Sequence, residues 1–308
     1  MQFQHAIQNY RFNVLLASSN AHGFHYYSID FDKTNHPIDI FRFTSKCQLH
    51  MVSCDGLIGS YDFGINMICL SNPSTLEYKY ISTLNSNEPF NRNSLLRYGV
   101  LYDWKIDDYK LLKLVADTEF SVTSEVWVCR LGSNSWDSIG NIPYNVRDIN
   151  FSEKPLNGII HWIGNTKVIV SFDIVEERFE ERIKEIQIPC CYLEDGLYSC
   201  KDMRVGLLGE DLYLSVHARH ERNIDLWVMT DYGDIDSWTK IFSLSKDDVN
   251  FDRLLPLHYL YKNREILLQG VSSKGKQDAL VSYNPNSGRL MTLDIPCIPK
   301  RFYATTFV

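Results

Sequence analysis

The stretch EVWVCRLGSNSWDSI occupies residues 125–139, and DLWVMTDYGDIDSWTKI repeats its design at residues 225–241. In each stretch an apolar run carries a tryptophan, a polar turn signal follows, and a second tryptophan opens the next run. Aromatic and β-branched residues on both sides of a cluster of Gly, Asn, Ser or Asp predict two strands joined by a hairpin turn. The recurrence of this hairpin predicts a repeat protein.

Other parts of the chain show the same strand–turn–strand pattern. Four further hairpins are predicted, at residues 24–43, 68–81, 168–183 and 279–293. Shorter turns precede them, at Asp55-Gly56, Asp107-Asp108, Asn157-Gly158, Glu210-Asp211 and residues 262–264. Asp-Gly and Asn-Gly pairs between apolar runs are strong hairpin signals. Four short strands per repeated unit are typical of a β-propeller blade. We therefore expect an all-β fold, a β-propeller of six four-stranded antiparallel blades, with five or seven blades as the alternatives.

The two ends of the chain complement each other. The first unit lacks a first strand before Arg11, and the chain ends in a strand-like run, RFYATTFV, at residues 301–308. A ring left open would expose an unpaired strand edge. We therefore expect Tyr303 to Val308 to pair with the strand from Phe12 to Ala17 and close the first blade.

One segment has a competing local pattern. In VEERFEERIKEI, at residues 175–186, Val175, Phe179, Ile183 and Ile186 recur at helical spacing with charged residues between them. Alone, the segment predicts an amphipathic helix. Its place in the repeat, where the other units carry a strand, favours a hairpin, because context often overrides local propensity in sheets.

The paired tryptophans are expected to serve packing. Trp127 and Trp227 fall in third strands, whereas Trp136 and Trp238 open fourth strands. Large rings fill the space between blades and contribute strongly to core stability. We predict that Trp127 and Trp227 are largely buried at equivalent positions.

Charge and cysteine content narrow the class of protein. The net charge is −7, and no Lys/Arg-rich block is present, which argues against nucleic-acid or anionic-membrane binding. No apolar run comes close to the length of about 18 residues that a membrane-spanning helix needs. The eight cysteines show no CxxC pair and follow no signal peptide, so we expect reduced thiols, no disulfide, and a location in the cytoplasm, the nucleus or both.

Catalytic and metal-binding motifs do not stand out. The chain contains no GxSxG, P-loop, GxGxxG or HExxH pattern. The close histidine pairs, His22 with His25 and His217 with His220, are expected to be solvent-exposed loop residues rather than metal ligands. The acidic run DYGDID, at residues 231–236, is expected to be a hairpin turn rather than a calcium loop. We expect no catalytic residue, metal or cofactor.

Long polar links are the better candidates for function. In a four-stranded antiparallel blade, the links between blades share one face with the links between second and third strands. These links are long at residues 83–95, 141–150, 189–202, 218–223, 243–252 and 272–277. Binding residues are often found in loops that a rigid scaffold holds in place. The predicted partner-binding residues on this face are Asn91, Arg92, Arg147, Glu194, Asp195, Arg219, His220, Arg222 and Lys274.

The order of several motifs resembles the plant F-box-associated domain. The motifs are SCDGLIGSYD, NPSTLEYKYI, YDWKIDDYKLLKLV, WVCRLGSNSWDSI, LNGIIHWIG and LWVMTDYG. They run in this order from about Phe12 to the end of the chain. Within that family the chain is most similar to S-locus F-box and related proteins.

The resemblance implies a role in substrate recognition by an SCF-type ubiquitin ligase. It implies one domain over residues 1–308 that binds a protein substrate, with residues 1–10 as a remnant of the linker that follows an F-box. No F-box pattern precedes Phe12, so contact with a Skp-type adaptor and cullin is expected only where an F-box is joined to the domain. The alternatives are a propeller hydrolase or lectin that binds carbohydrate in the channel, and a stand-alone interaction or decoy module.

Overall fold

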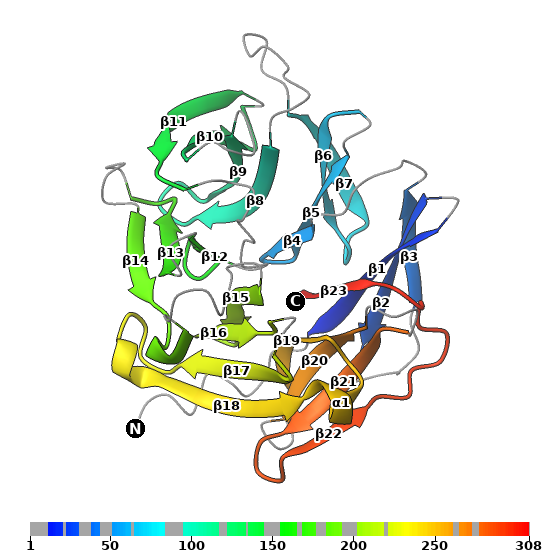
Figure 1. The fold of residues 1–308 in the computed structure, drawn as a ribbon. Coiled ribbons are helices and arrows are strands. Elements are labelled where there is room, and N and C mark those ends of the chain that lie inside the picture. Colours follow the sequence, from blue (N-terminus) through cyan, green and yellow to red (C-terminus); the bar gives the residue numbers. More distant parts are fainter. Residues whose placement is uncertain are drawn as a thin grey trace.

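Six antiparallel sheets surround a common centre (Figure 1). The computed structural model describes residues 12–20, 23–30, 38–43, 51–62, 65–83, 95–116, 122–133, 135–144, 155–164, 168–176, 183–192, 202–218, 221–260, 265–272 and 277–307. Strands that are neighbours in a sheet are mostly neighbours in sequence, as in a meander. The predicted six-bladed β-propeller is therefore confirmed.

The first three blades each have four strands. Blade one contains β23 (Tyr303–Phe307), β1 (Asn13–Asn20), β2 (Gly23–Asp30) and β3 (Ile38–Phe43). Blade two contains β4 (Met51–Cys54), β5 (Leu57–Asp62), β6 (Met67–Asn72) and β7 (Glu77–Ser82). Blade three contains β8 (Leu95–Asp103), β9 (Asp108–Ala116), β10 (Ser124–Arg130) and β11 (Trp136–Ile142).

The other three blades follow the same plan. Among the described residues, blade four has three strands, β12 (Ile159–Ile163), β13 (Val168–Asp173) and β14 (Ile183–Gln187). Blade five contains β15 (Met203–Leu208), β16 (Asp211–Val216), β17 (Asn223–Met229) and β18 (Trp238–Ser245). Blade six contains β19 (Arg253–Leu260), β20 (Glu265–Val271), β21 (Ala279–Asn284) and β22 (Arg289–Thr292).

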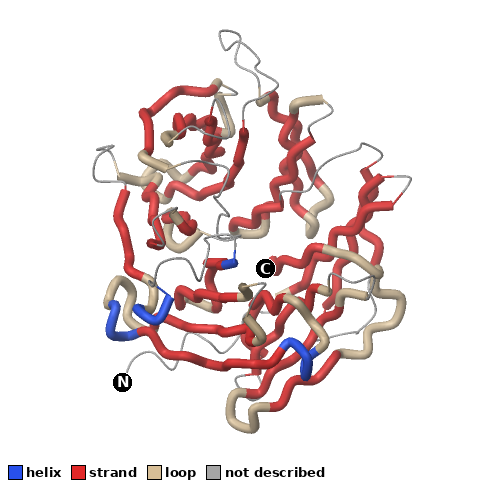
Figure 2. Tube along the Cα trace, in the orientation of Figure 1, coloured by secondary structure: helices blue, strands red, loops and turns tan. Residues whose placement is uncertain are grey.

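Helices are short in the described part of the chain (Figure 2). α1 (Lys246–Val249) follows β18, and the 3-10 turns η3 (Cys190–Tyr192) and η5 (Ile235–Ser237) lie in links. No helix among the described residues is long and apolar enough to cross a membrane. The pairing of β13 with β14 confirms the hairpin predicted for blade four over the competing helix.

The C-terminal strand closes the ring. β23 pairs antiparallel with β1, from Ala17 opposite Tyr303 to Asn13 opposite Phe307, which confirms the predicted closure. Gln269 of blade six donates to the Phe302 carbonyl at 2.6 Å and accepts from the Ala304 N–H at 3.1 Å. Blade six therefore holds the closing segment through hydrogen bonds between the Gln269 side chain and the main chain of that segment, as well as through packing.

The tight turns have the backbone that their sequences predict. Asp55 and Gly56 have φ values of 45° and 80°, and Asn157 and Gly158 have 50° and 81°. Such positive φ angles are readily adopted by Gly and tolerated by Asn and Asp. At Gly158 space is also limited, because an added Cβ would lie 2.8 Å from Val175 Cγ2.

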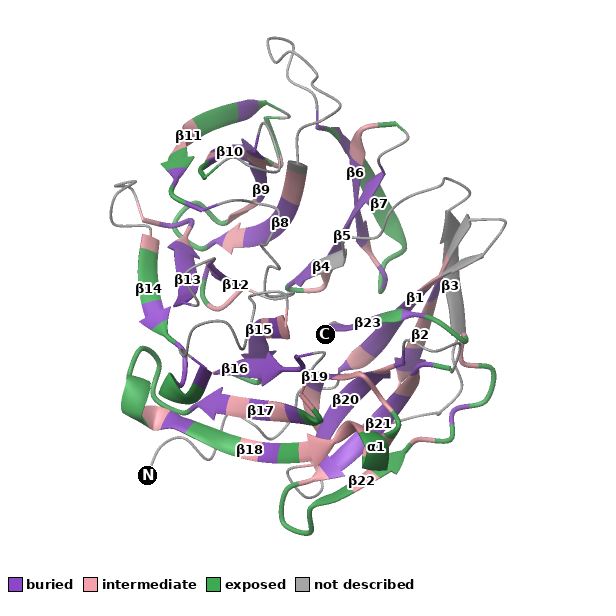
Figure 3. Cartoon of the chain, viewed as in Figure 1, coloured by how far each residue is buried: buried purple, intermediate pink, exposed green. Residues whose placement is uncertain are grey.

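The core lies between neighbouring blades, where the inner strands are mostly buried and the outer strands carry most of the exposed positions (Figure 3). Trp136 and Trp238 are buried there, and each donates a hydrogen bond to the outer strand of the preceding blade. Trp136 Nε1 reaches the Ser82 carbonyl at 2.8 Å, and Trp238 Nε1 reaches the Gln187 carbonyl at 3.0 Å. The repeated tryptophan therefore joins one blade to the next.

The prediction for Trp127 and Trp227 is right in position and holds in part for burial, because both pack against the core without being fully buried. Both follow a register shift in the third strand of their blades, so their positions are equivalent. Both are only partly buried. A lysine ammonium, of Lys113 or Lys240, lies 4.9 Å from each ring centroid, so a polar side chain occupies space that we had expected to be apolar.

Candidate functional site

The antiparallel blades place their connections on two opposite faces. The turn face carries the turns from first to second and from third to fourth strands, including residues 55–56, 104–107 and 209–210. The loop face carries the links between blades and those from second to third strands, including residues 217–218, 221–222 and 246–252. β1 is the second strand of blade one, so the chain enters it from the turn face.

The predicted partner-binding set falls mostly outside the described residues. Arg222 is described, is exposed, and lies on the loop face just before β17. Its carbonyl accepts a hydrogen bond from the Lys246 N–H at 2.8 Å, which fixes the link against α1. The other predicted residues lie outside the described part of the chain: Asn91, Arg92, Arg147, Glu194, Asp195, Arg219, His220 and Lys274.

The same link contains a histidine whose solvent exposure was predicted incorrectly from the sequence. His217 follows β16 and was expected to be solvent-exposed, but its side chain is only 4% exposed. The main-chain N–H of His217 donates to the Asp202 carbonyl at 2.8 Å. The Lys246 ammonium donates to the Ala218 carbonyl and, at 3.0 Å, to the Glu221 carbonyl, so α1 holds the link down. The link is therefore part of the packed loop face rather than a free loop.

Three basic residues lie near His217. Lys246 donates to the carbonyl of the next residue, Ala218, and Arg204 lies opposite Ser215 in the ladder of β15 and β16. Arg253 precedes Leu254, whose carbonyl accepts from Ser215 Oγ at 3.1 Å. Arg204 lies near the start of β15, Arg253 begins β19, and Lys246 begins α1. Burial first, and then the positive charges of Arg204, Arg253 and Lys246, lower the pKa of His217 to about 2. The imidazole is therefore neutral at physiological pH, with one N–H donor and one acceptor nitrogen.

Carboxylates lie nearby and act on Lys246. Burial lowers the pKa of Lys246, whereas Asp252, Asp202 and Glu221 raise it. The site therefore contains charges of both signs, with the basic groups acting on the buried imidazole. Arg204, Lys246 and Arg253 were missed at the sequence level. A basic residue close behind an aspartate at the start of β15 and of β19 was the available signal.

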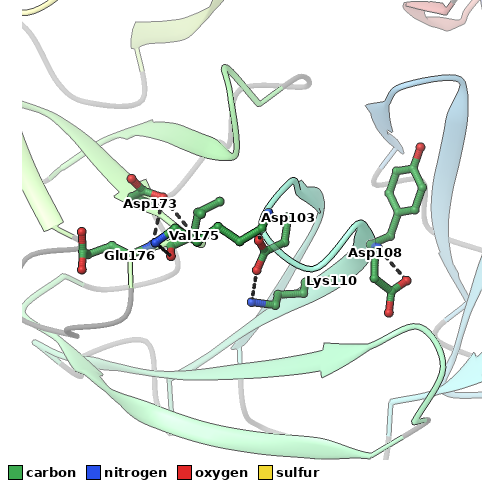
Figure 4. A network of polar contacts seen from close by, with 8 residues as sticks. Asp103, Asp108, Lys110, Asp173, Val175 and Glu176 are labelled. Carbon is green, nitrogen blue, oxygen red and sulfur yellow. Dashed lines mark hydrogen bonds and ion pairs between the residues drawn. The ribbon is translucent and has the colours of Figure 1, made fainter.

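The turn face has a different chemistry. Figure 4 shows its carboxylates directed at nearby groups: Asp103 pairs with Lys110, and Asp173 accepts from the Val175 N–H at 2.8 Å. Asp103 also accepts from the Lys105 N–H at 3.0 Å, and the Lys105 ammonium reaches the Val175 carbonyl at 3.2 Å. The carboxylates therefore stabilise turns within blades three and four, and the Lys105 ammonium connects the two blades.

The acidic run at residues 231–236 is a turn, as predicted. The Asp234 side chain accepts from the Asp236 N–H at 3.0 Å and caps η5. Tyr232 of this turn contacts blade four, where its hydroxyl lies 2.8 Å from Nε2 of buried His161. Within the described ranges no group of three or more His, Cys, Asp or Glu residues is arranged to hold a metal ion.

Comparison with known families identifies the domain. The family model described as the F-box associated beta propeller domain matches residues 4–291. The chain belongs to this family. Its similarity to "F-box protein CPR1" of Arabidopsis thaliana is 25% identity over 313 residues, which cover 92% of this chain and 72% of that protein. "F-box protein At3g07870" of Arabidopsis thaliana is 27% identical over 91% of this chain and 75% of its own length.

Solved structures share the fold of this F-box associated propeller at low identity. A chain of a nidogen/laminin complex superposes with a TM-score of 0.57 at 10% identity, covering 96% of this chain and 98% of that chain. An oligogalacturonate lyase in complex with manganese superposes with a TM-score of 0.54 at 8% identity, covering 94% of this chain and 76% of that chain. At such identities the likeness concerns the fold alone, because unrelated functions share a propeller scaffold.

Proposed function

We propose that this F-box associated propeller is the substrate-recognition module of an SCF-type ubiquitin ligase. It binds a protein and presents it for ubiquitination, and other subunits carry out the transfer. The family match over residues 4–291 carries the proposal, and the F-box proteins among its relatives support it. A Skp-type adaptor and cullin would be partners wherever an F-box is joined to the domain.

The arrangement of the two faces supports separate places for an upstream domain and for the target protein. Because the chain enters β1 from the turn face, a domain joined upstream would lie on that side of the ring. The loop face, with Arg222 and the residues around His217, would then be free for the target protein. Charged loops on a rigid ring favour selection through electrostatic complementarity.

The alternative functions predict different behaviour. A hydrolase would need carboxylates positioned around a substrate, as glycosidases do, whereas Asp103 and Asp173 of the turn face already bind lysine or main-chain groups. A lectin would bind glycans with no protein partner. A decoy module would bind the target of a related ligase without recruiting an adaptor. Assays for bound protein, adaptor and glycan separate these alternatives.

Reversing Arg222 together with Arg219, which the sequence predicts for the same link, should weaken partner capture. We expect Arg219→Glu with Arg222→Glu to lower recovery of the bound protein by about tenfold or more, the effect of losing about 1.4 kcal/mol. Arg222 is exposed, so the melting temperature should stay near that of the parent. The measurement is affinity capture with quantitative mass spectrometry, followed by ubiquitination of the captured protein in a ligase reconstituted with an F-box.

A matched pair on the opposite face provides the control. Arg130 and Arg289 are exposed and flank turns of the turn face. Reversing both to Glu makes the same change in net charge and should leave capture intact. If the control pair abolishes capture and the loop-face pair does not, the target binds the turn face and the proposed arrangement is wrong.

The proposal includes a reducing compartment, the cytoplasm, the nucleus or both. The described cysteines are Cys54, Cys69, Cys129, Cys190, Cys191 and Cys297, and none of these six forms a disulfide. Thiol titration of freshly purified protein under denaturing, non-reducing conditions should therefore return all eight cysteines of the chain. A lower count would indicate disulfides and an oxidising compartment.

A further inference from the structure

His217 is a buried polar side chain whose hydrogen bonds are unfilled. Both Nδ1 and Nε2 are buried, and neither has a hydrogen-bond partner among the described residues. A buried polar atom without a partner is uncommon and unfavourable. The main-chain carbonyls of Ala218 and Glu221 in the link accept from the Lys246 ammonium of α1 instead. The imidazole therefore has hydrogen-bonding capacity that packing alone does not use.

The cluster around this imidazole has one buried residue, which we call its floor, and three partly exposed residues, which we call its rim. His217 is buried, whereas Arg204, Lys246 and Arg253 are all partly exposed. They come from the inner strands of blades five and six and from α1, which places the cluster on the loop face between two blades. The three cations are therefore more accessible to solvent than the imidazole is.

We infer that this cluster binds an oxyanion, a carboxylate or a phosphate, carried by the protein target, with Arg204, Arg253 and Lys246 as the cationic rim and the N–H of His217 as a donor from the floor. The inference rests on the proposed function, because it names the chemistry that the loop face would recognise. Arg pairs well with both groups because its planar fork matches two oxygens. A metal ion is disfavoured here, since three cations would repel it.

The neighbouring carboxylates limit how tightly a free anion is expected to bind at this cluster. Asp202, Glu221 and Asp252 lie close enough to Lys246 to raise its pKa, so they compete with an incoming anion. A free ion should therefore bind weakly, and binding should weaken further as salt is added. A protein target that places its anionic group here would add the contacts that a free ion lacks.

The test is a titration of the unaltered chain with simple ions. In protein labelled with 13C at histidine, the ring resonance of His217, assigned by its loss in His217→Gln, is followed during addition of sodium phosphate or sodium acetate, with sodium chloride at matched ionic strength. We expect a saturable shift of this resonance with phosphate, acetate or both, and none with chloride. The ion that saturates at the lower concentration tells whether a phosphate or a carboxylate is the better ligand. Equal response to chloride, or no saturable response, would overturn the inference.

Variants then locate the site. Arg204→Gln with Arg253→Gln should raise the apparent dissociation constant by about tenfold, which corresponds to about 1.4 kcal/mol. Arg289→Gln, on the exposed rim of blade six, should leave it unchanged. A shift that persists in the double variant would contradict the inference. Ion binding without protein capture would leave an anion site but no recognition module, whereas capture without ion binding would remove this inference alone.

Discussion

Removing the closing strand, residues 303–308, should lower the free energy of unfolding by about 5 kcal/mol, among the largest effects expected of a local change. The deletion exposes the inner edge of β1, which pairs with β23 at five positions. It also takes away buried Ala304, Thr305 and Thr306 and a contact to blade two, the hydrogen bond from Ser53 Oγ to the Thr306 carbonyl at 3.1 Å. Equilibrium unfolding in urea measures the difference.

A single substitution tests the same closure without shortening the chain. Gln269→Leu keeps the bulk of the side chain but leaves the Phe302 carbonyl and the Ala304 N–H without partners, so we expect a loss of about 2 kcal/mol. Gln277→Leu, an exposed residue near the start of β21, is the control and should change little. If the truncated chain unfolds at the same urea concentration as the parent, the ring does not depend on β23.

The fold could be predicted from the sequence because its signals are local. Asp55-Gly56 and Asn157-Gly158 specify tight turns through backbone conformation, and both have the positive φ angles that such turns need. Closure followed from a different rule, that an unpaired strand edge is unfavourable, and the pairing of Ala17 with Tyr303 agrees with it. Neither inference required knowledge of how distant side chains meet.

The candidate site could be predicted only in part, because its chemistry depends on contacts between side chains that are far apart in sequence. Arg222 was found since it lies in a polar link, and position in the repeat is enough to assign its face. Arg204 and Arg253 are far apart in sequence and come together only because neighbouring inner strands begin at the same end of the ring. The burial of His217 follows from the contacts of Lys246 with the link, which no sequence pattern indicates.

Replacing Trp136 or Trp238 with Ala should destabilise the protein by about 3–5 kcal/mol, as truncation of a large buried ring does. Each residue packs between two blades and also donates to a carbonyl of the preceding blade. The effect should exceed that of Trp127→Ala or Trp227→Ala, whose rings are partly exposed. Equilibrium urea unfolding of the four variants measures the ranking.

Two further variants separate the hydrogen bond from the packing. Trp136→Phe keeps an aromatic ring but removes the donor to the Ser82 carbonyl, and we expect a loss of about 1 kcal/mol from the hydrogen bond. Trp104→Ala is the control, because Trp104 is 61% exposed on the turn face and its removal should cost little. If Trp136→Ala is no more destabilising than Trp104→Ala, the repeated tryptophan does not join the blades. Its recurrence in blades three and five would then need another explanation, such as contact with a binding partner.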